Sequence, residues 1–269
     1  MSIAHWNEPD FKRPSGVAPS KEALNLATIL RMVFSAIASV LSAAFAVVVF
    51  LRLRKSRRPA FAAWTLGLLL FAGAAAFQAA GETGGWTPIT FRGFYLLGGV
   101  LGVIYLALGT IFLLTPRRFA WACAIALGVI TIVLAVDAAV IPVDSAKLTT
   151  AKGVLGDAIQ QGSLLFIGVV FLNIIGTLVL VGGSGWSAYR FVRDHAGIDR
   201  VICNVLLTGG ALIIAVGFSA AKTVGIGNLD ILGLYETVGI AIMFGGFLAL
   251  GRVGVRHTST GPATVASGS

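Results

Sequence analysis

The sequence predicts an all-α fold, a polytopic membrane bundle of seven transmembrane helices. Three observations lead to this class: apolar residues make up 57% of the 269 residues, charged residues make up 12%, and the mean hydropathy is +0.92. A soluble domain carries about 25% charged residues, so a surface this poor in charge suits lipid rather than water. The composition excludes a soluble enzyme, a disordered chain and a fibrous repeat.

Seven segments are long enough to cross a membrane, which takes about 20 apolar residues in a helix. Pro59, Pro116 and Pro142 lie at segment edges, where proline disturbs a helix least. The predicted spans are Leu24–Leu51, Phe61–Ala80, Phe91–Leu114, Phe119–Ile141, Ser163–Trp186, Val201–Lys222 and Leu229–Leu250. They divide the chain into a polar extracytoplasmic segment (1–23), a seven-helix domain (24–251) and a short disordered tail (252–269). Residues 151–162 are a candidate short helix on the membrane surface.

Lysine and arginine are concentrated in the loops on one side of the predicted bundle, and such loops face the cytoplasm. Seven spans then place the N-terminus outside and the C-terminus in the cytoplasm, in a plasma membrane. This topology accounts for the net charge of +9 without a nucleic-acid partner. Two of these loops, Leu51–Arg58 and Tyr189–Arg200, are predicted to contact a cytoplasmic or membrane protein. The basic residues of this side are Arg52, Arg54, Lys55, Arg57, Arg58, Arg117, Arg118, Arg190, Arg193, Arg200, Arg252 and Arg256.

Ionisable residues inside spans are costly and often functional, and here they fall in the predicted outer half. One interpretation is an outward-facing pocket that binds a polar solute or relays a proton, with Asp137 and Glu236 as proton carriers and Arg31 as counter-charge. The alternative is that these charges pair across helices, while Arg92 and Lys222 extend to the headgroups. The candidate cluster consists of Arg31, Gln78, Glu82, Arg92, Asp137, Lys222 and Glu236, with Asp230 beside them.

The sequence shows no catalytic, metal or cofactor motif. Cys123 and Cys203 are too few for a structural zinc site, which takes about four ligands, and no histidine lies in a span where it could bind haem. The seventh span lacks the lysine that holds retinal in microbial rhodopsins. Gly182–Gly185 lacks the Lys-Ser/Thr of a phosphate-binding loop. We therefore predict neither an enzyme nor a cofactor.

Short segments recur about 140 residues further along the chain. Phe77-Gln-Ala-Ala-Gly81 returns as Phe218-Ser-Ala-Ala-Lys222, and Leu106–Gly109 returns as Leu248–Gly251. Two three-helix repeats joined by a fourth span resemble the SWEET and PQ-loop transporters, although the chain lacks their Pro-Gln motif and hinge prolines. This resemblance implies a small secondary transporter or proton-coupled carrier.

Two further resemblances are to proteins other than transporters. The stretch Phe91–Arg118 is similar to bacterial multi-spanning membrane proteins of uncharacterised activity, and Ala62–Phe77 resembles the membrane-sensing halves of some bacterial signalling proteins. The second resemblance implies a sensor module whose output lies on a separate protein. We therefore expect a sensor-like or partner-subunit module with an outward-facing polar pocket. The transporter and a purely structural membrane subunit are the alternatives.

Fusion proteins test the predicted orientation. We expect a green fluorescent protein fused after Ser269 to fluoresce in bacterial cells, and alkaline phosphatase fused there to stay inactive, because its disulfides form only outside the cytoplasm. Phosphatase inserted after Thr83, in a predicted outer loop, is the matched control and should be active. An active enzyme after Ser269 would overturn the orientation.

Overall fold

The computed structural model describes residues 21–150, 162–194, 198–223 and 232–256. Most of the polar N-terminal segment, most of the tail and nearly all of the expected surface helix over 151–162 lie outside these residues. Asp230 also lies outside them, and the side chain of Lys222 is not described.

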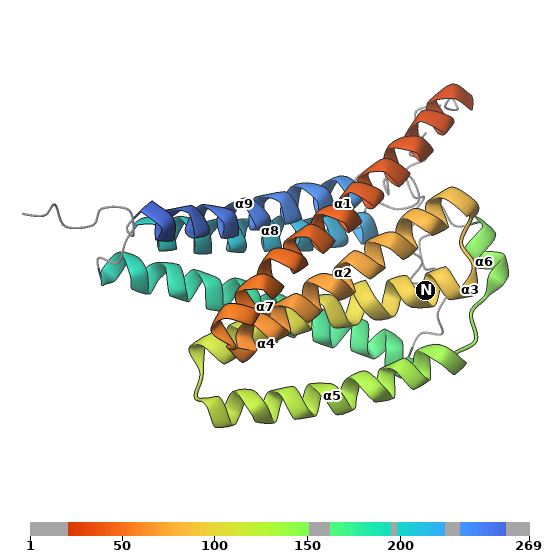
Figure 1. Cartoon of the computed structure of the whole chain (residues 1–269). Helices are drawn as coiled ribbons and strands as arrows, with labels where there is room; N and C mark the ends of the chain where they lie inside the picture. The colour runs from red at the N-terminus through yellow and green to blue at the C-terminus, as the bar shows by residue number, and fades with distance from the viewer. Residues whose placement is uncertain (1–20, 151–161, 195–197, 224–231, 257–269) are drawn as a thin grey trace, which may run out of the picture.

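Every element in the described part of the chain is a helix, and seven helical segments are long and apolar enough to cross a membrane (Figure 1). The all-α class with seven membrane-spanning segments is thereby confirmed. The elements are α1 (Lys21–Ser56), α2 (Pro59–Gly84), α3 (Pro88–Phe94), the π-helix η1 (Tyr95–Gly102), α4 (Val103–Leu114), α5 (Arg117–Val140), α6 (Ser145–Thr150), α7 (Leu164–Arg193), α8 (Ile198–Thr223) and α9 (Leu232–Arg256).

The third span is not the single regular helix that the sequence predicts. It begins at a capping box, in which the hydroxyl of Thr87 accepts from the backbone N–H of Thr90 and the hydroxyl of Thr90 accepts from the backbone N–H of Thr87. It then passes from α3 through η1 into α4. A π-helix bonds each N–H one residue further back than an α-helix does. Within η1, the carbonyl oxygen of Gly99 accepts from the side-chain amide of Asn173 on α7 at 3.1 Å.

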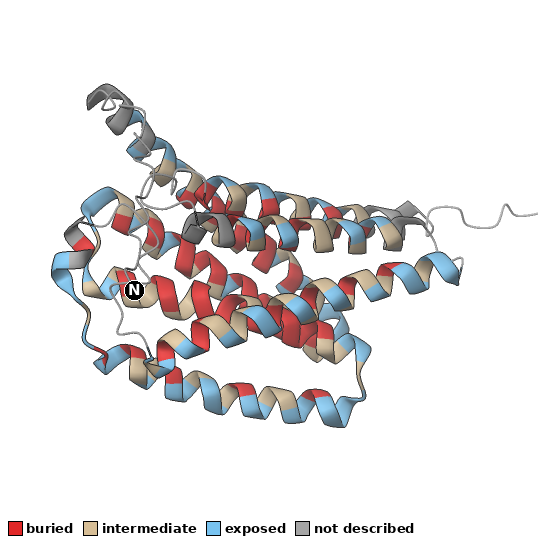
Figure 2. Cartoon of the chain, turned by 180° about the vertical axis from the view of Figure 1, so that it is seen from behind, coloured by how far each residue is buried: buried red, intermediate tan, exposed pale blue. Residues whose placement is uncertain are grey.

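Six of the seven spans form a closed ring, and the remaining span, α5, lies outside it. Around the ring α1 packs on α2, α2 on η1 and α4, α4 on α7, α7 on α8, α8 on α9, and α9 on α1. Among the described residues, α5 makes its main contacts with η1, α4 and α7, on one side of this ring, and it stands apart in Figure 1. Its surface is largely exposed and apolar, as at Ile125, Ile132 and Val140, and Figure 2 shows buried residues gathered inside the ring instead. Lipid is the environment that such a helix fits.

The two ends of the bundle differ in character. The connections after α1, α4 and α7 lie at one end, on the left in Figure 1, and carry the basic loops; we call this the basic end. The opposite end, which we call the Glu82 end, holds α3 and α6 and the acidic residues Glu82, Asp137 and Glu236. The connection between α1 and α2 is very short and places Arg57 at a φ of +52°, a backbone conformation that is uncommon outside glycine.

Glycines allow the closest helix approaches. A Cβ atom on Gly239 of α9 would lie 2.7 Å from the carbonyl oxygen of Gly210 on α8, and a Cβ on Gly210 would collide with the carbonyl of Gly239. The backbones of α8 and α9 therefore touch at this pair. Gly245, which lies four residues after Ala241 on the same helix, has open space around it and does not make this contact.

We expect Gly239→Ala to lower the free energy of unfolding by about 2 kcal/mol, because the added methyl group forces two packed backbones apart. Gly245→Ala is the matched control, and should be neutral or slightly stabilising, since alanine is the better helix former by about 1 kcal/mol. Detergent-induced unfolding followed by circular dichroism measures both. Equal effects of the two changes would contradict the α8–α9 contact.

Candidate functional site

Helices α1 and α2 bring a polar group together at the Glu82 end. The carboxylate of Glu82 accepts two hydrogen bonds, one at Oε2 from the hydroxyl of Ser35 and one at Oε1 from the side-chain amide of Gln78, both at 2.9 Å. Gln78 and Glu82 are four residues apart on α2, so they share a helix face. Ser35 and Gln78 are fully buried and Glu82 is half-buried.

Glu236 joins this group from α9. The hydroxyl of Thr237 donates to the carbonyl oxygen of Phe34 at 2.8 Å, and a Cβ on Gly233 would lie 3.0 Å from the hydroxyl oxygen of Ser35. The turn of α9 that contains Glu236 therefore packs directly on the turn of α1 that contains Ser35. The side chain of Glu236 is only 2% exposed, and Ser35, in the turn of α1 on which this part of α9 packs, donates to the carboxylate of Glu82.

This cluster, which we call the Glu236 site (Ser35, Gln78, Glu82 and Glu236), has too few hydrogen-bond donors. Atom Oε2 of Glu236 and atom Oε1 of Gln78 are both buried, and neither has a hydrogen-bond partner among the described residues. Leaving a buried acceptor unsatisfied costs about 1–3 kcal/mol. A proton, or a small ligand that donates hydrogen bonds, would remove this cost.

Arg31 lies on the approach to the site. It precedes Ser35 by four residues on α1, which puts both on one helix face, and its side chain is half-buried. The structure thus gathers Arg31, Gln78, Glu82 and Glu236 of the predicted cluster along the α1–α2–α9 seam. Lys222 stands at the end of α8, but its side chain lies outside the described atoms.

Arg92 and Asp137 are placed elsewhere, at a junction of α3, α5 and α7. Atom Oδ2 of Asp137 accepts from the backbone N–H of Leu165 at 2.8 Å, in the first turn of α7. Arg92 donates from Nη2 to the carbonyl oxygen of Ile141, just past the end of α5, at 2.6 Å. Both side chains therefore satisfy backbone groups at helix ends. These bonds are to backbone groups rather than to an opposite charge, so they give both residues a role in packing. The proton-carrier interpretation of Asp137 stays a prediction.

Sequence analysis missed Ser35. The signal is present, because Arg31, Ser35, Ser39 and Ser42 recur at helical spacing through an apolar segment. Ser39 donates to the carbonyl oxygen of Ala72 at 2.8 Å, which ties α1 to α2 beside the site. Ser42 is fully buried and its hydroxyl oxygen has no partner among the described residues.

The described residues contain no group of three or more His, Cys, Asp or Glu side chains that could hold a metal ion. No family model matches the chain, and neither the curated proteins nor the solved structures compared with it give a match. The chemistry of the Glu236 site is therefore the guide to function.

The capping role of Asp137 predicts a specific stability pattern. Asp137→Ala should lower the free energy of unfolding by about 1 kcal/mol, as the loss of a helix N-cap does. Asp137→Asn should lose much less, because the side-chain carbonyl oxygen still accepts from Leu165. Thermal unfolding in detergent measures both variants. If asparagine proves as damaging as alanine, the negative charge matters rather than the acceptor.

Proposed function

We propose that the chain is a sensor-like or partner-subunit module of the plasma membrane, in which the Glu236 site takes up a proton from the extracytoplasmic side. The observation that carries this proposal is the burial of Glu236 with Oε2 unsatisfied, beside the half-buried carboxylate of Glu82. A proton on Glu236 would supply the missing donor and remove the repulsion between two like charges. A buried ionisable residue within a membrane is a candidate functional site by default.

Helix α9 offers a direct route from this site to the other end of the bundle. Glu236 and Phe247 lie on the same helix, about 16 Å apart along its axis. The ring of Phe247 packs against that of Phe45 at an interplanar angle of 57°, with centroids 5.4 Å apart, and the guanidinium group of Arg52 lies over the Phe247 ring at 5.0 Å. A shift of α9 would therefore reach the start of the basic loop Leu51–Arg58.

The basic end supplies the surface for a partner. Arg54, Lys55, Arg57 and Arg58 are exposed in the turn after α1. In the second predicted contact, Tyr189–Arg200, the side chains of Tyr189 and Arg193 are exposed, and Arg193 pairs with Asp194 at 3.1 Å. We propose that a cytoplasmic or membrane protein binds these two loops and responds to a shift of α9.

The proposal predicts a protonated carboxyl group in the folded protein. Infrared spectroscopy of the protein in bilayers should show the C=O stretch of a carboxylic acid, and this band should disappear in Glu236→Gln. Asp137→Asn removes the other deep carboxyl group and is the matched control, which should keep the band. A band that survives Glu236→Gln would contradict proton uptake at Glu236.

A flux measurement separates a sensor from a carrier. Liposomes that contain the wild-type protein and a pH-sensitive dye should show no proton flux beyond that of empty liposomes. Glu236→Gln, which resembles the proton-loaded site in shape and in donors, should behave in the same way. Flux that depends on Glu236 would refute the sensor and favour the carrier.

The carrier is the second candidate, and the position of α5 favours it. With α5 outside the ring, the ring consists of two triplets, α1 to α4 and α7 to α9, joined by one peripheral span. Phe77 and Phe218, which correspond in the sequence repeat, lie on the second helix of each triplet.

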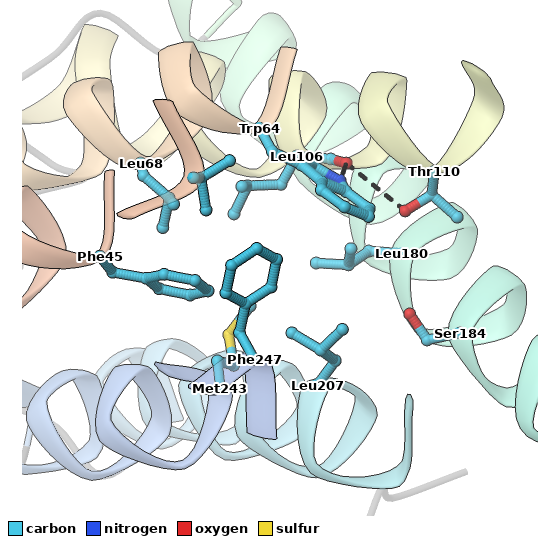
Figure 3. Close-up of a pocket in the computed structure, with 11 residues that line it drawn as sticks. Phe45, Trp64, Leu68, Leu106, Thr110, Leu180, Ser184, Leu207, Met243 and Phe247 are labelled. Atoms are coloured by element: carbon cyan, nitrogen blue, oxygen red, sulfur yellow. Dashed lines mark hydrogen bonds between the residues drawn. The ribbon is translucent and has the colours of Figure 1, made fainter. Parts of the chain in front are cut away.

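The interior of the ring fits a carrier less well. Figure 3 shows a cavity near the basic end in which aromatic and aliphatic side chains dominate, with hydroxyl groups only at Thr110 and Ser184. A polar solute would find little to bind there.

A further inference from the structure

A lateral cavity of about 310 Å³ lies between η1, α7 and α8, away from the Glu236 site. Phe94, Tyr95 and Gly99 form one wall, a stretch of α7 forms the second, and Ala215 and Phe218 form the third. Ligand pockets in proteins range from roughly 300 to 1,000 Å³. This cavity is therefore large enough to hold part of a small molecule or of a lipid chain.

Its lining is apolar except at Tyr95, Asn173 and Thr177. On α7, the amide of Asn173 donates to the carbonyl oxygen of Gly99, and the hydroxyl of Thr177 donates to Oδ1 of Asn173 at 3.4 Å. The first of these bonds joins α7 to the π-helix η1. Asn173 retains a second N–H and Thr177 retains acceptor lone pairs, so the pair can still bind one more polar group.

The cavity opens sideways, onto the surface that faces lipid. Ile174 and Leu178 line it and are 54% and 68% exposed. They continue a stripe of exposed apolar residues on α7 that includes Phe171 and Ile175. A molecule would therefore enter from the bilayer, and the part that does not fit would remain among the lipid chains.

The depth of Asn173 in the membrane limits the kind of polar group that a ligand can place beside it. Asn173 lies nine residues into α7, about 14 Å along its axis, close to the middle of a hydrocarbon core of about 30 Å. A charged headgroup is costly at that depth. A hydroxyl or carbonyl group is far less costly to bury, provided that it finds a hydrogen-bond partner.

We propose that this cavity binds an apolar chain from the bilayer that carries one neutral oxygen group, as in a long-chain alcohol or a quinone, with that oxygen hydrogen-bonded to Asn173 and Thr177. The same two residues, together with Phe218, also line a smaller cavity at the centre of the ring. The polar pair thus lies where the lateral cavity meets the ring interior, and it fixes how far the ligand enters.

Photolabelling of the full chain in liposomes tests the site. The probe is a long-chain alcohol with a diazirine group, added with and without an excess of the unlabelled alcohol. We expect saturable labelling of residues 169–178 and of Phe218. Val170→Phe fills the cavity and should abolish this labelling, whereas Ile167→Phe, on the same helix but outside the cavity lining, should leave it unchanged. Labelling that does not saturate, or that survives Val170→Phe, overturns the site.

A second variant addresses the polar end without filling the cavity. Thr177→Val keeps the side-chain shape and should lower the apparent affinity of the alcohol about fivefold, the effect of one hydrogen bond. Thr208→Val removes a hydroxyl that bonds only to its own helix, at Asn204, and should have no effect. An alkane of the same length that competes as well as the alcohol would overturn the proposed role of Asn173 and Thr177.

Discussion

The contact between α1 and α9 is the constraint on which the rest of the structure depends. It joins the first span to the last and so closes the ring. It is made by a glycine, Gly233, that lets the backbones approach at Ser35, and by the bond from Thr237 to the carbonyl oxygen of Phe34. Without it Glu236 would face lipid, where an acidic side chain costs about 2.5 kcal/mol or more. The closed ring keeps Glu236 away from lipid and so lowers the cost of a carboxyl group within the membrane. The polar side chains enclosed with Glu236 mark this part of the ring as the candidate site.

The ionisable residues within the spans of this protein differ in the hydrogen bonds that they make. Asp137 and Arg92 bind backbone groups at helix ends, and a membrane requires such bonds because water is absent there. These bonds explain where both residues sit in the bundle, although atom Nε of Arg92 is buried without a hydrogen-bond partner among the described residues. Glu236 differs from Asp137 in that its Oε2 atom is buried without such a partner. The unsatisfied carboxyl oxygen, rather than the charge itself, therefore sets Glu236 apart from Asp137.

The sequence predicted the spans well because hydropathy acts on each helix separately. Pro59 begins α2 and Pro116 precedes α5, as proline geometry requires. Contacts between helices were harder to predict from the sequence. The approach of Ser35 and Glu236 joins residues about 200 positions apart, and no local pattern encodes it. The sequence also did not predict the π-helix in the third span, which Asn173 of α7 contacts at the carbonyl oxygen of Gly99. The contributions of Lys222 and Asp230 lie outside the described side chains.

The distribution of polarity along the ring bears on how a signal could cross the membrane. Polar side chains surround Glu236 at one end, whereas the cavity near the basic end is bounded by Phe45, Trp64 and Phe247 (Figure 3). Water and ions cross a membrane protein along polar surfaces, and this interior offers no continuous one among its described residues. A change at Glu236 can nevertheless reach Arg52 through α9, because a helix of this length moves as a stiff body and its aromatic contacts at the far end are close-packed. Mechanical coupling through a helix is what the proposed sensor needs, whereas a carrier needs a polar path, which the cavities between the described helices do not provide.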